Sequence, residues 1–299
     1  FSSELSADED VSNSRRQVHG ACFSRVLPTA TAKPKTLAVT EDVCSLIGIS
    51  SKAAKSNDFT QVISGNATTK GMDPHAMCYG CHHFGNWAGQ LGAGRAINLR
   101  EVRGIASKRY MLQLKGAGPT PYSRSGDGRA VLRSSIREFL CSEAMYHLNV
   151  PTTRALSLCS TGDNVVRDMF YDGNIAEEIG AVVCRVAESF IRFGNFEIFS
   201  SRGDHDGLIN LLNFTLRHHF PEINDPSPDG YVNFFRQVVS STALLMAHWQ
   251  RVGFVHGVMN TDNMSILGET LDYGPYGFMD KFNPSHVCNL SDTSGRYSY

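Results

Sequence analysis

The sequence predicts an α+β protein in which strands dominate the first half and helices the second. Residues 97–102 and Arg109–Lys115 alternate in polarity and lie close enough in sequence to form an antiparallel hairpin. From Asp206 onward, apolar residues recur at a helical spacing over residues 208–216 and again over residues 235–249. No internal repeat interrupts this order, so we expect one mixed-class chain.

Shorter elements connect these regions. A capped helix is predicted after Thr40, and a longer one is predicted to open with a capping box of Ser135 and Glu138 and to end at Asn149. Gly- and Asp-rich dipeptides indicate turns between short strands. The remaining predictions are strands at 155–158, 165–171 and 181–187, turns at 162–163 and 172–174, and polar connecting chain at 50–70.

Composition excludes several classes of protein. The 299 residues include 28 Lys and Arg against 29 Asp and Glu, and this balance lacks the positive charge of a nucleic-acid or anionic-membrane binder. No uncharged apolar run reaches the ~18 residues that cross a bilayer. The 8 cysteines are mostly scattered, which predicts free thiols in a reducing compartment. We therefore expect a soluble intracellular protein without nucleic-acid or membrane partners.

The chain divides into three predicted parts. Residues 1–38 form an extended N-terminal arm, residues 39–200 a strand-rich lobe with glycine-rich loops, and residues 201–299 a mainly helical lobe that carries the last polar segment. The chain opens at Phe1 rather than Met, and its acidic first residues show no transit or signal peptide. Because no polar tail closes it after Tyr299, we expect a processed or C-terminally truncated chain.

Several residues of the strand-rich lobe suit phosphate binding. Gly92, Gly94 and Arg95 form a glycine-rich turn whose amides could approach phosphate oxygens, although a tight hairpin turn explains them equally well. Lys115 ends an apolar strand, where its ammonium group could pair with phosphates or lie in solvent. The capping box is by itself a sufficient reason for a carboxylate at Glu138. Yet a glutamate in the first helix after a strand that ends in lysine is also the order of parts in kinase-like nucleotide sites.

The segment after the last helix carries hard oxygen ligands. Asp262 and Asn263 precede the short apolar run 264–267, and Asp272 follows it, which predicts a hairpin with ligands at both ends. Carboxylate and amide oxygens are the ligands that Mg²⁺ prefers. A polar turn between a helix and a strand is the alternative explanation.

Two arginines stand in an apolar setting. Arg185 and Arg192 flank the run 186–191, where an unpaired guanidinium would be costly. Each therefore needs an anionic partner. Internal salt bridges to Glu188 or Glu197 would provide one, and triphosphate oxygens would provide another.

A third candidate site is the run from Cys78 through Cys81 to His83, which imitates a zinc or redox motif. The sequence has no second cysteine pair at the spacing of a structural zinc ribbon. Thiol or zinc chemistry therefore ranks last among the candidates.

Five long motifs resemble those of the selenoprotein O family, also known as the YdiU family. The resemblance runs from about Gly20 to Tyr299, and its motifs are residues 87–92, 113–124, 126–140, 166–173 and 256–268. It implies a protein-kinase-like bilobal fold. It also implies a protein adenylyltransferase that moves AMP from ATP to Ser, Thr or Tyr hydroxyls of other proteins.

The resemblance also implies a role for each candidate residue. The residues that would contact the nucleotide or its phosphates are Gly92, Gly94, Arg95, Lys115, Asp127, Gly128, Arg185, Arg192 and Asp272, with Glu138 as the ion-pair partner of Lys115. Asp262 would accept the proton of the attacking hydroxyl. Asn263 and Asp272 would bind Mg²⁺, with Mn²⁺ as an alternative.

The chain departs from the family pattern near the first glycine turn. Ala93 stands where the family usually has Asp, and the run 79–85 replaces a Gly-Gly-His-Gln-Phe-Gly sequence. These changes leave a second hypothesis open, a catalytically impaired, pseudokinase-type ATP-binding protein. Eukaryotic members are typically mitochondrial, so the resemblance also implies a mitochondrial location.

Overall fold

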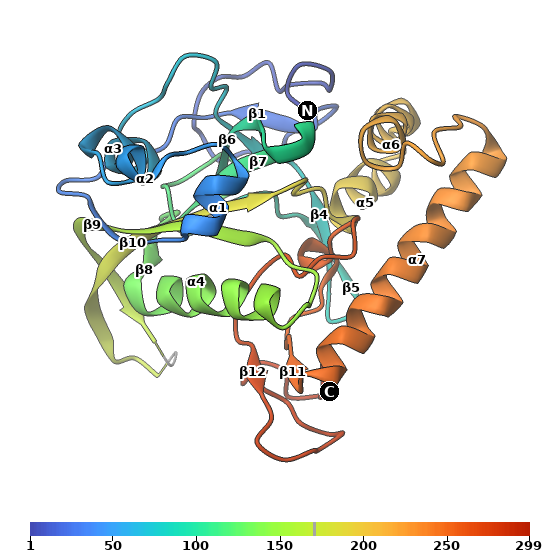
Figure 1. Cartoon of the computed structure of the whole chain (residues 1–299). Helices are drawn as coiled ribbons and strands as arrows, with labels where there is room; N and C mark the ends of the chain where they lie inside the picture. Colours follow the sequence, from blue (N-terminus) through green and yellow to red (C-terminus); the bar gives the residue numbers. More distant parts are fainter. Residues whose placement is uncertain (170–171) are drawn as a thin grey trace.

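An antiparallel sheet forms the centre of the molecule (Figure 1). The computed structural model describes residues 1–169 and 172–299, and in these residues the main sheet has eight strands. Their order is β1-β3-β6-β7-β10-β9-β2, with β8 paired to β10. The bounds are β1 Phe23–Arg25, β2 Lys35–Val39, β3 His75–Met77, β6 Ala96–Arg103, β7 Arg109–Lys115, β8 Ala130–Val131, β9 Arg154–Asp168 and β10 Ile175–Ala187.

Helices and two small hairpins surround this sheet. The helices are α1 Glu41–Leu46, α2 Ser51–Ala54, α3 Asn57–Ser64, α4 Leu132–His147, α5 Phe193–Ser201, α6 His205–His219 and α7 Pro228–Arg251, with short 3₁₀ turns η1 Ile105–Ser107 and η2 Thr261–Asn263. The hairpins pair β4 Gly80–His83 with β5 Asn86–Gln90 and β11 Phe254–Val255 with β12 Gly277–Phe278. This mixed composition confirms the predicted α+β class.

The two faces of β10 pack against different layers, as the alternation of side chains along a strand requires. Ala181 and Val183 pack with Phe139 of α4. Val182 and Cys184 belong to the larger core on the other face. Figure 1 shows α4 on one side of β9 and β10 and α1 to α3 on the other. The central strands are therefore buried on both faces.

The predicted hairpin is confirmed by β6 and β7, which pair antiparallel with Ala96 opposite Lys115. The predicted short helix is α1, and the two predicted late helices are α6 and α7. The N-terminal arm is more integrated than expected, because it supplies β1 and β2 to the main sheet. Helix α5 was not predicted, since its aromatic and glycine residues give little helical periodicity.

Two predictions of irregular structure are wrong. Residues 50–70 contain α2 and α3, which begin where the hydroxyls of Ser50 and Ser56 accept hydrogen bonds from the backbone amides of Ala53 and Phe59. The predicted turn at 162–163 lies inside β9, which joins the strands predicted at 155–158 and 165–171. The pairing with β10 shifts there, so the Gly–Asp pair marks a β-bulge. Phe170 and Tyr171 lie outside the described residues.

The predicted start and apolar faces of the helices also need correction. Helix α4 begins at Leu132 directly after β8, so Ser135 and Glu138 lie inside it and form no capping box. Its predicted apolar residue Leu140 is 61% exposed, and Phe235 of α7 is 67% exposed. Spacing alone could not show which part of each face meets the core.

One buried carboxylate makes stability depend on pH. Burial and, to a smaller extent, the neighbouring Glu188 raise the pKa of Glu269 to about 8, against an opposing effect of Lys108. In the described part of the chain, Glu269 Oε2 has no hydrogen-bond partner. A carboxyl with a raised folded-state pKa stabilises the fold below its unfolded pKa, and that stability is lost as pH rises through the folded pKa.

We predict that the free energy of unfolding falls between pH 5 and pH 8 by on the order of 3 kcal/mol, because the unfolded chain releases the Glu269 proton in this range while the folded chain largely retains it. Glu269→Gln should flatten this fall, whereas the exposed Glu222→Gln should not. Urea unfolding at a series of pH values measures both. An unchanged slope in Glu269→Gln would contradict the assignment.

Candidate active site

The residues predicted to bind nucleotide and metal converge on one cavity of about 740 Å³. Those that line it are Gly92, Gly94, Arg95, Lys115, Asp127, Gly128, Arg185, Arg192, Asp262, Asn263 and Asp272. Glu138 lines an adjoining pocket together with Arg95 and Lys115. Residues separated by up to 180 positions in the sequence are thus brought into one site.

Two glycines let the loops at the rim pack closely. Gly92 has φ of +69°, and a Cβ at this position would lie 2.3 Å from the ring of Tyr122. Gly128 has φ of +71°, and a Cβ there would lie 2.1 Å from the carbonyl carbon of Gly118. Both contacts are too short for a side chain, and both φ values disfavour L-residues. The two glycine-rich loops therefore pack on the same segment, 118–122.

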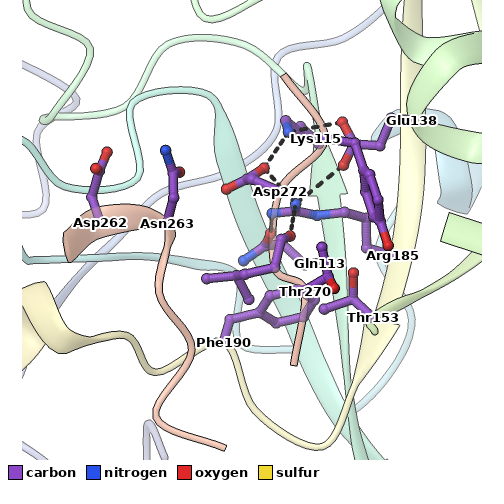
Figure 2. Close-up of polar contacts among 12 residues, drawn as sticks. Gln113, Lys115, Glu138, Thr153, Arg185, Phe190, Asp262, Asn263, Thr270 and Asp272 are labelled. Carbon is purple, nitrogen blue, oxygen red and sulfur yellow. Dashed lines mark hydrogen bonds and ion pairs between the residues drawn. The ribbon is translucent and has the colours of Figure 1, made fainter. Parts of the chain in front are cut away.

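The floor of the cavity is a buried ionic cluster (Figure 2). Lys115 Nζ of β7 lies 2.8 Å from Glu138 Oε2 of α4 and also contacts Asp272. Arg185 Nη1 of β10 lies 3.1 Å from Glu138 Oε1 and 2.8 Å from Asp272 Oδ1. Arg192 Nη1 lies 3.6 Å from Asp272 Oδ2. Each carboxylate is therefore shared between at least two cations.

The sheet itself positions this cluster. Antiparallel pairing sets Gln113 of β7 opposite Arg185 of β10, and the Gln113 side chain accepts a hydrogen bond from Arg185. Gln113 in turn donates to Asn98 at 2.7 Å. Arg185 also donates to the carbonyl of Leu271 at 2.9 Å, which ties the segment before Asp272 to the sheet. The guanidinium is thereby held in a single orientation.

Electrostatics fix the charge state of Asp272. Burial by itself would raise the pKa of this carboxyl, but Lys115, Arg185 and Arg192 together hold the pKa well below its usual range. The acidic group stays ionised at neutral pH. It is then available both to the cations around it and to a metal ion.

The cluster carries more positive than negative charge. Its three cations, Lys115, Arg185 and Arg192, face two carboxylates, Glu138 and Asp272. The described lining of the whole cavity has the same bias, with Arg95, Lys115, Arg124, Arg129, Arg167, Arg185 and Arg192 against Asp127, Asp262 and Asp272. Buried positive charge without a partner is costly. The cavity therefore suits a polyanion.

The structure bears on the alternative explanations of Lys115, Arg185 and Arg192. The side chain of Lys115 is only 11% exposed, so it is not a solvated strand end. Arg185 and Arg192 do form internal ion pairs, but with Glu138 and Asp272. The partners named from sequence are wrong, because Glu188 pairs with Lys108 and Glu197 contacts His82.

Asp262 and Asn263 lie together in η2, at one side of the ionic cluster (Figure 2). Arg192 donates to the backbone carbonyl of Asp262 at 2.8 Å and thereby anchors the turn. The Asn263 amide nitrogen donates to Val258 at 3.0 Å, so its oxygen is the atom that could serve as a metal ligand. The predicted hairpin over residues 264–267 is wrong: this run forms only isolated bridges, including Met264 to Thr270.

Further lining residues were missed although they lie in or beside the recognised motifs. His256 lines the cavity, and its ring stacks on that of Trp249 with 5.1 Å between the ring centroids. Burial lowers the pKa of His256 to about 4, so its ring is neutral at neutral pH. Arg167 lies 2.7 Å from Asp127 and braces the second glycine loop. Tyr79 lies under the guanidinium of Arg192 at 4.5 Å. Arg167 lies inside the motif 166–173, so a cation within a recognised motif was the available signal for it.

Comparison with known proteins gives the family. A family model described as protein adenylyltransferase SelO matches residues 10–299. The chain belongs to the SelO family. This SelO family chain is 59% identical over 296 residues to protein nucleotidyltransferase YdiU of Azoarcus sp. (strain BH72), and the match covers 99% of this chain and 57% of that protein.

Two other relatives with the same name give a similar result. Identity is 58% over 305 residues to the protein of Rhodopirellula baltica, covering 100% of this chain and 56% of that protein. It is 53% over 296 residues to the protein of Flavobacterium johnsoniae, covering 99% and 56%. The SelO family chain thus spans a little more than half the length of these curated relatives. They are bacterial, so they give the expected mitochondrial location no support.

The structure also bears on membranes. Among residues 1–169 and 172–299, no helix has the combined length and apolar character needed to cross a bilayer.

We predict that Glu138→Gln in this SelO family chain lowers the free energy of unfolding by about 3 kcal/mol, because Lys115 and Arg185 then lose a buried counter-charge. Glu178→Gln is the matched control, since it breaks a more exposed pair with Arg133 and should cost less than about 1 kcal/mol. Urea unfolding compares the two. Equal losses would show that the cluster does not depend on Glu138.

Proposed function

We propose that this SelO family chain is a protein adenylyltransferase with a kinase-like, two-lobed arrangement of its site. It would transfer AMP from ATP to Ser, Thr or Tyr hydroxyls of proteins. The single observation that supports this is the buried excess of positive charge at the cavity floor, next to the carboxylate of Asp262. A triphosphate supplies the negative charge that this floor lacks.

In the proposed mechanism, Lys115, Arg185 and Arg192 bind the phosphate oxygens and orient the nucleotide. Their positions are fixed before binding by Glu138 and by the hydrogen bonds of Arg185, so little reorganisation is needed when charge develops. The side chain of Arg95 adds a contact at the rim. The amides of Gly92, Ala93 and Gly94 already donate to backbone carbonyls, so the amide contacts expected from sequence are not part of this mechanism. Transfer chemistry of this kind depends mainly on such positioning.

Asn263 and Asp272 are the residues that would hold Mg²⁺. Both line the cavity, and their amide and carboxylate oxygens are the hard ligands that this ion takes. The low pKa of Asp272 keeps its carboxylate ready for a metal. Bound Mg²⁺ would supply further neutralisation of phosphate charge.

Asp262 is the proposed proton acceptor. The hydroxyl oxygen of the target protein bonds to the α-phosphorus, the bond from this phosphorus to the bridging oxygen breaks, and pyrophosphate leaves with that electron pair. The hydroxyl proton passes to the Asp262 carboxylate. Arg192 holds the backbone of this residue, so the same side chain that binds phosphate also positions the acceptor.

ATP binding without transfer is the second candidate. The observation that favours it is Ala93, which lines the cavity with a methyl group where the resembled family usually has a carboxylate. In this case ATP would raise the melting temperature of the chain while no label reached protein.

We predict that the chain incorporates label from ATP marked on the α-phosphate and not from ATP marked on the γ-phosphate. Asp262→Asn and Asp272→Asn should each lower incorporation by about 100-fold or more, since each removes a group used in transfer. Incorporation is measured by autoradiography of the chain and an added protein extract in Mg²⁺.

Asp73→Asn is the control, because this carboxylate pairs with Arg25 outside the cavity. It should leave incorporation within about two-fold of the unsubstituted chain. Label from γ-marked ATP alone would identify an ordinary kinase and reject the proposal. ATP-dependent stabilisation without any label would favour the second candidate.

A further inference from the structure

A cluster of metal-ligating groups lies beside the proposed proton acceptor. The thiol of Cys81, the ring of His83 and the carboxylate of Asp262 each offer one ligand atom, and these atoms all lie within 4.8 Å of one another. Cys81 Sγ lies 3.0 Å from Asp262 Oδ1 and donates a hydrogen bond to it. None of the roles described above uses Cys81 or His83.

Strand β4 explains why these groups meet. Cys81 and His83 are two residues apart, so alternation along the strand directs both toward η2. His82 lies between them, and its ring contacts Glu197 of α5 instead, at 2.9 Å. The two cluster residues of β4 therefore share one side of the strand.

Other hydrogen bonds fix β4 against η2. The His82 backbone amide donates to Thr261 Oγ1 at 2.8 Å, and the Phe84 amide donates to Asn260 Oδ1 at 3.3 Å. The Thr261 hydroxyl also donates to Glu197. These bonds hold the three ligand residues in place before any ion is bound, so the ordering cost of a metal site has already been met by the fold.

The donor set favours zinc over magnesium. A thiolate and an imidazole are soft and borderline ligands that suit Zn²⁺, whereas Mg²⁺ takes oxygen ligands. Three protein ligands leave a fourth tetrahedral position for water. His83 and Asp262 are only partly buried, so an ion can reach them from solvent.

The cluster differs from the cysteine pair considered from sequence. Cys78 Sγ contacts Gln90 Oε1 at 3.9 Å and the carbonyl oxygen of Val18 at 4.0 Å, and Cys78 is not a member of the cluster. The ligands are instead one cysteine and the second histidine of the run, completed by a residue 179 positions after His83. Cys81 and His83 also fall at the Gly and Gln positions of the Gly-Gly-His-Gln-Phe-Gly sequence, where this chain departs from the resembled family.

We propose that Cys81, His83 and Asp262 form a Zn²⁺ site, and that the bound ion inhibits AMP transfer by occupying the carboxylate of Asp262. When Zn²⁺ binds, the sulfur–hydrogen bond of Cys81 breaks, its proton passes to water and the sulfur electron pair forms the bond to the metal. The binding half of this proposal stands on the cluster alone. The inhibitory half rests on the proposed role of Asp262.

Equilibrium dialysis with Zn²⁺, followed by metal analysis, tests the site. The chain should bind one ion, and Cys81→Ser and His83→Gln should each weaken binding at least 10-fold. Cys78→Ser is the matched control and should bind as the unsubstituted chain does. With Co²⁺ in place of Zn²⁺, a thiolate-to-cobalt absorption band should appear in the control and be lost in Cys81→Ser.

Two dialysis results would contradict the proposed zinc site. In the first, the folded chain binds no zinc. In the second, Cys78→Ser and Cys81→Ser weaken zinc binding equally. Melting curves check that each variant is folded. If Cys81→Ser does not fold, the zinc affinity of His83→Gln still tests the site.

Inhibition is tested as the rate of α-label transfer with Zn²⁺ divided by the rate without it, in excess Mg²⁺. Zn²⁺ should lower the transfer rate of the unsubstituted chain at least 10-fold, and it should lower that of His83→Gln less than two-fold. An equal loss in both would overturn the inhibitory half while dialysis decides the site. If the chain transfers no label even without zinc, both the proposed function and the inhibitory half of this proposal are rejected. Dialysis would still decide whether the zinc site exists.

Discussion

The buried ionic cluster of Lys115, Glu138, Arg185 and Asp272 is the interaction on which the rest of the structure depends. Each member comes from a different part of the fold: β7, α4, β10 and the segment after η2. Removing charged groups from water is expensive, and the cost is offset only when geometry and hydrogen bonding are good. The cluster therefore specifies how the sheet, α4 and the last polar segment fit together.

The same cluster gives the cavity its chemical character. With Arg192, which also pairs with Asp272, three cations face two carboxylates, which hold them in place but are too few to neutralise them. The close approach at Gly92 and Gly128 then packs both glycine-rich loops onto the segment 118–122 at the rim. A site built in this way is shaped and charged for an anion before one arrives.

Two aspartates of the cavity have separate environments. Asp272 is surrounded by cations that hold its pKa low, whereas Asp262 receives a hydrogen bond from a thiol and is anchored through its backbone by Arg192. This division fits a metal ligand and a proton acceptor that work side by side. It also places the thiol of Cys81, a soft metal ligand, in contact with the carboxylate of Asp262.

The sequence by itself determined the α+β class, the β6–β7 hairpin, the late helices and the identities of the candidate residues, because these follow from local periodicity and from long motifs. The local pattern left Glu138 open between a helix cap and the ion pair that the resemblance implied, since the outcome depends on where α4 begins after β8. Nor could the sequence show that Cys81, and not Cys78, is the cysteine that contacts Asp262. Only the tertiary structure decided these points, because contacts between residues 81 and 262 or 115 and 272 arise from the pairing of strands and turns, which no short-range pattern records.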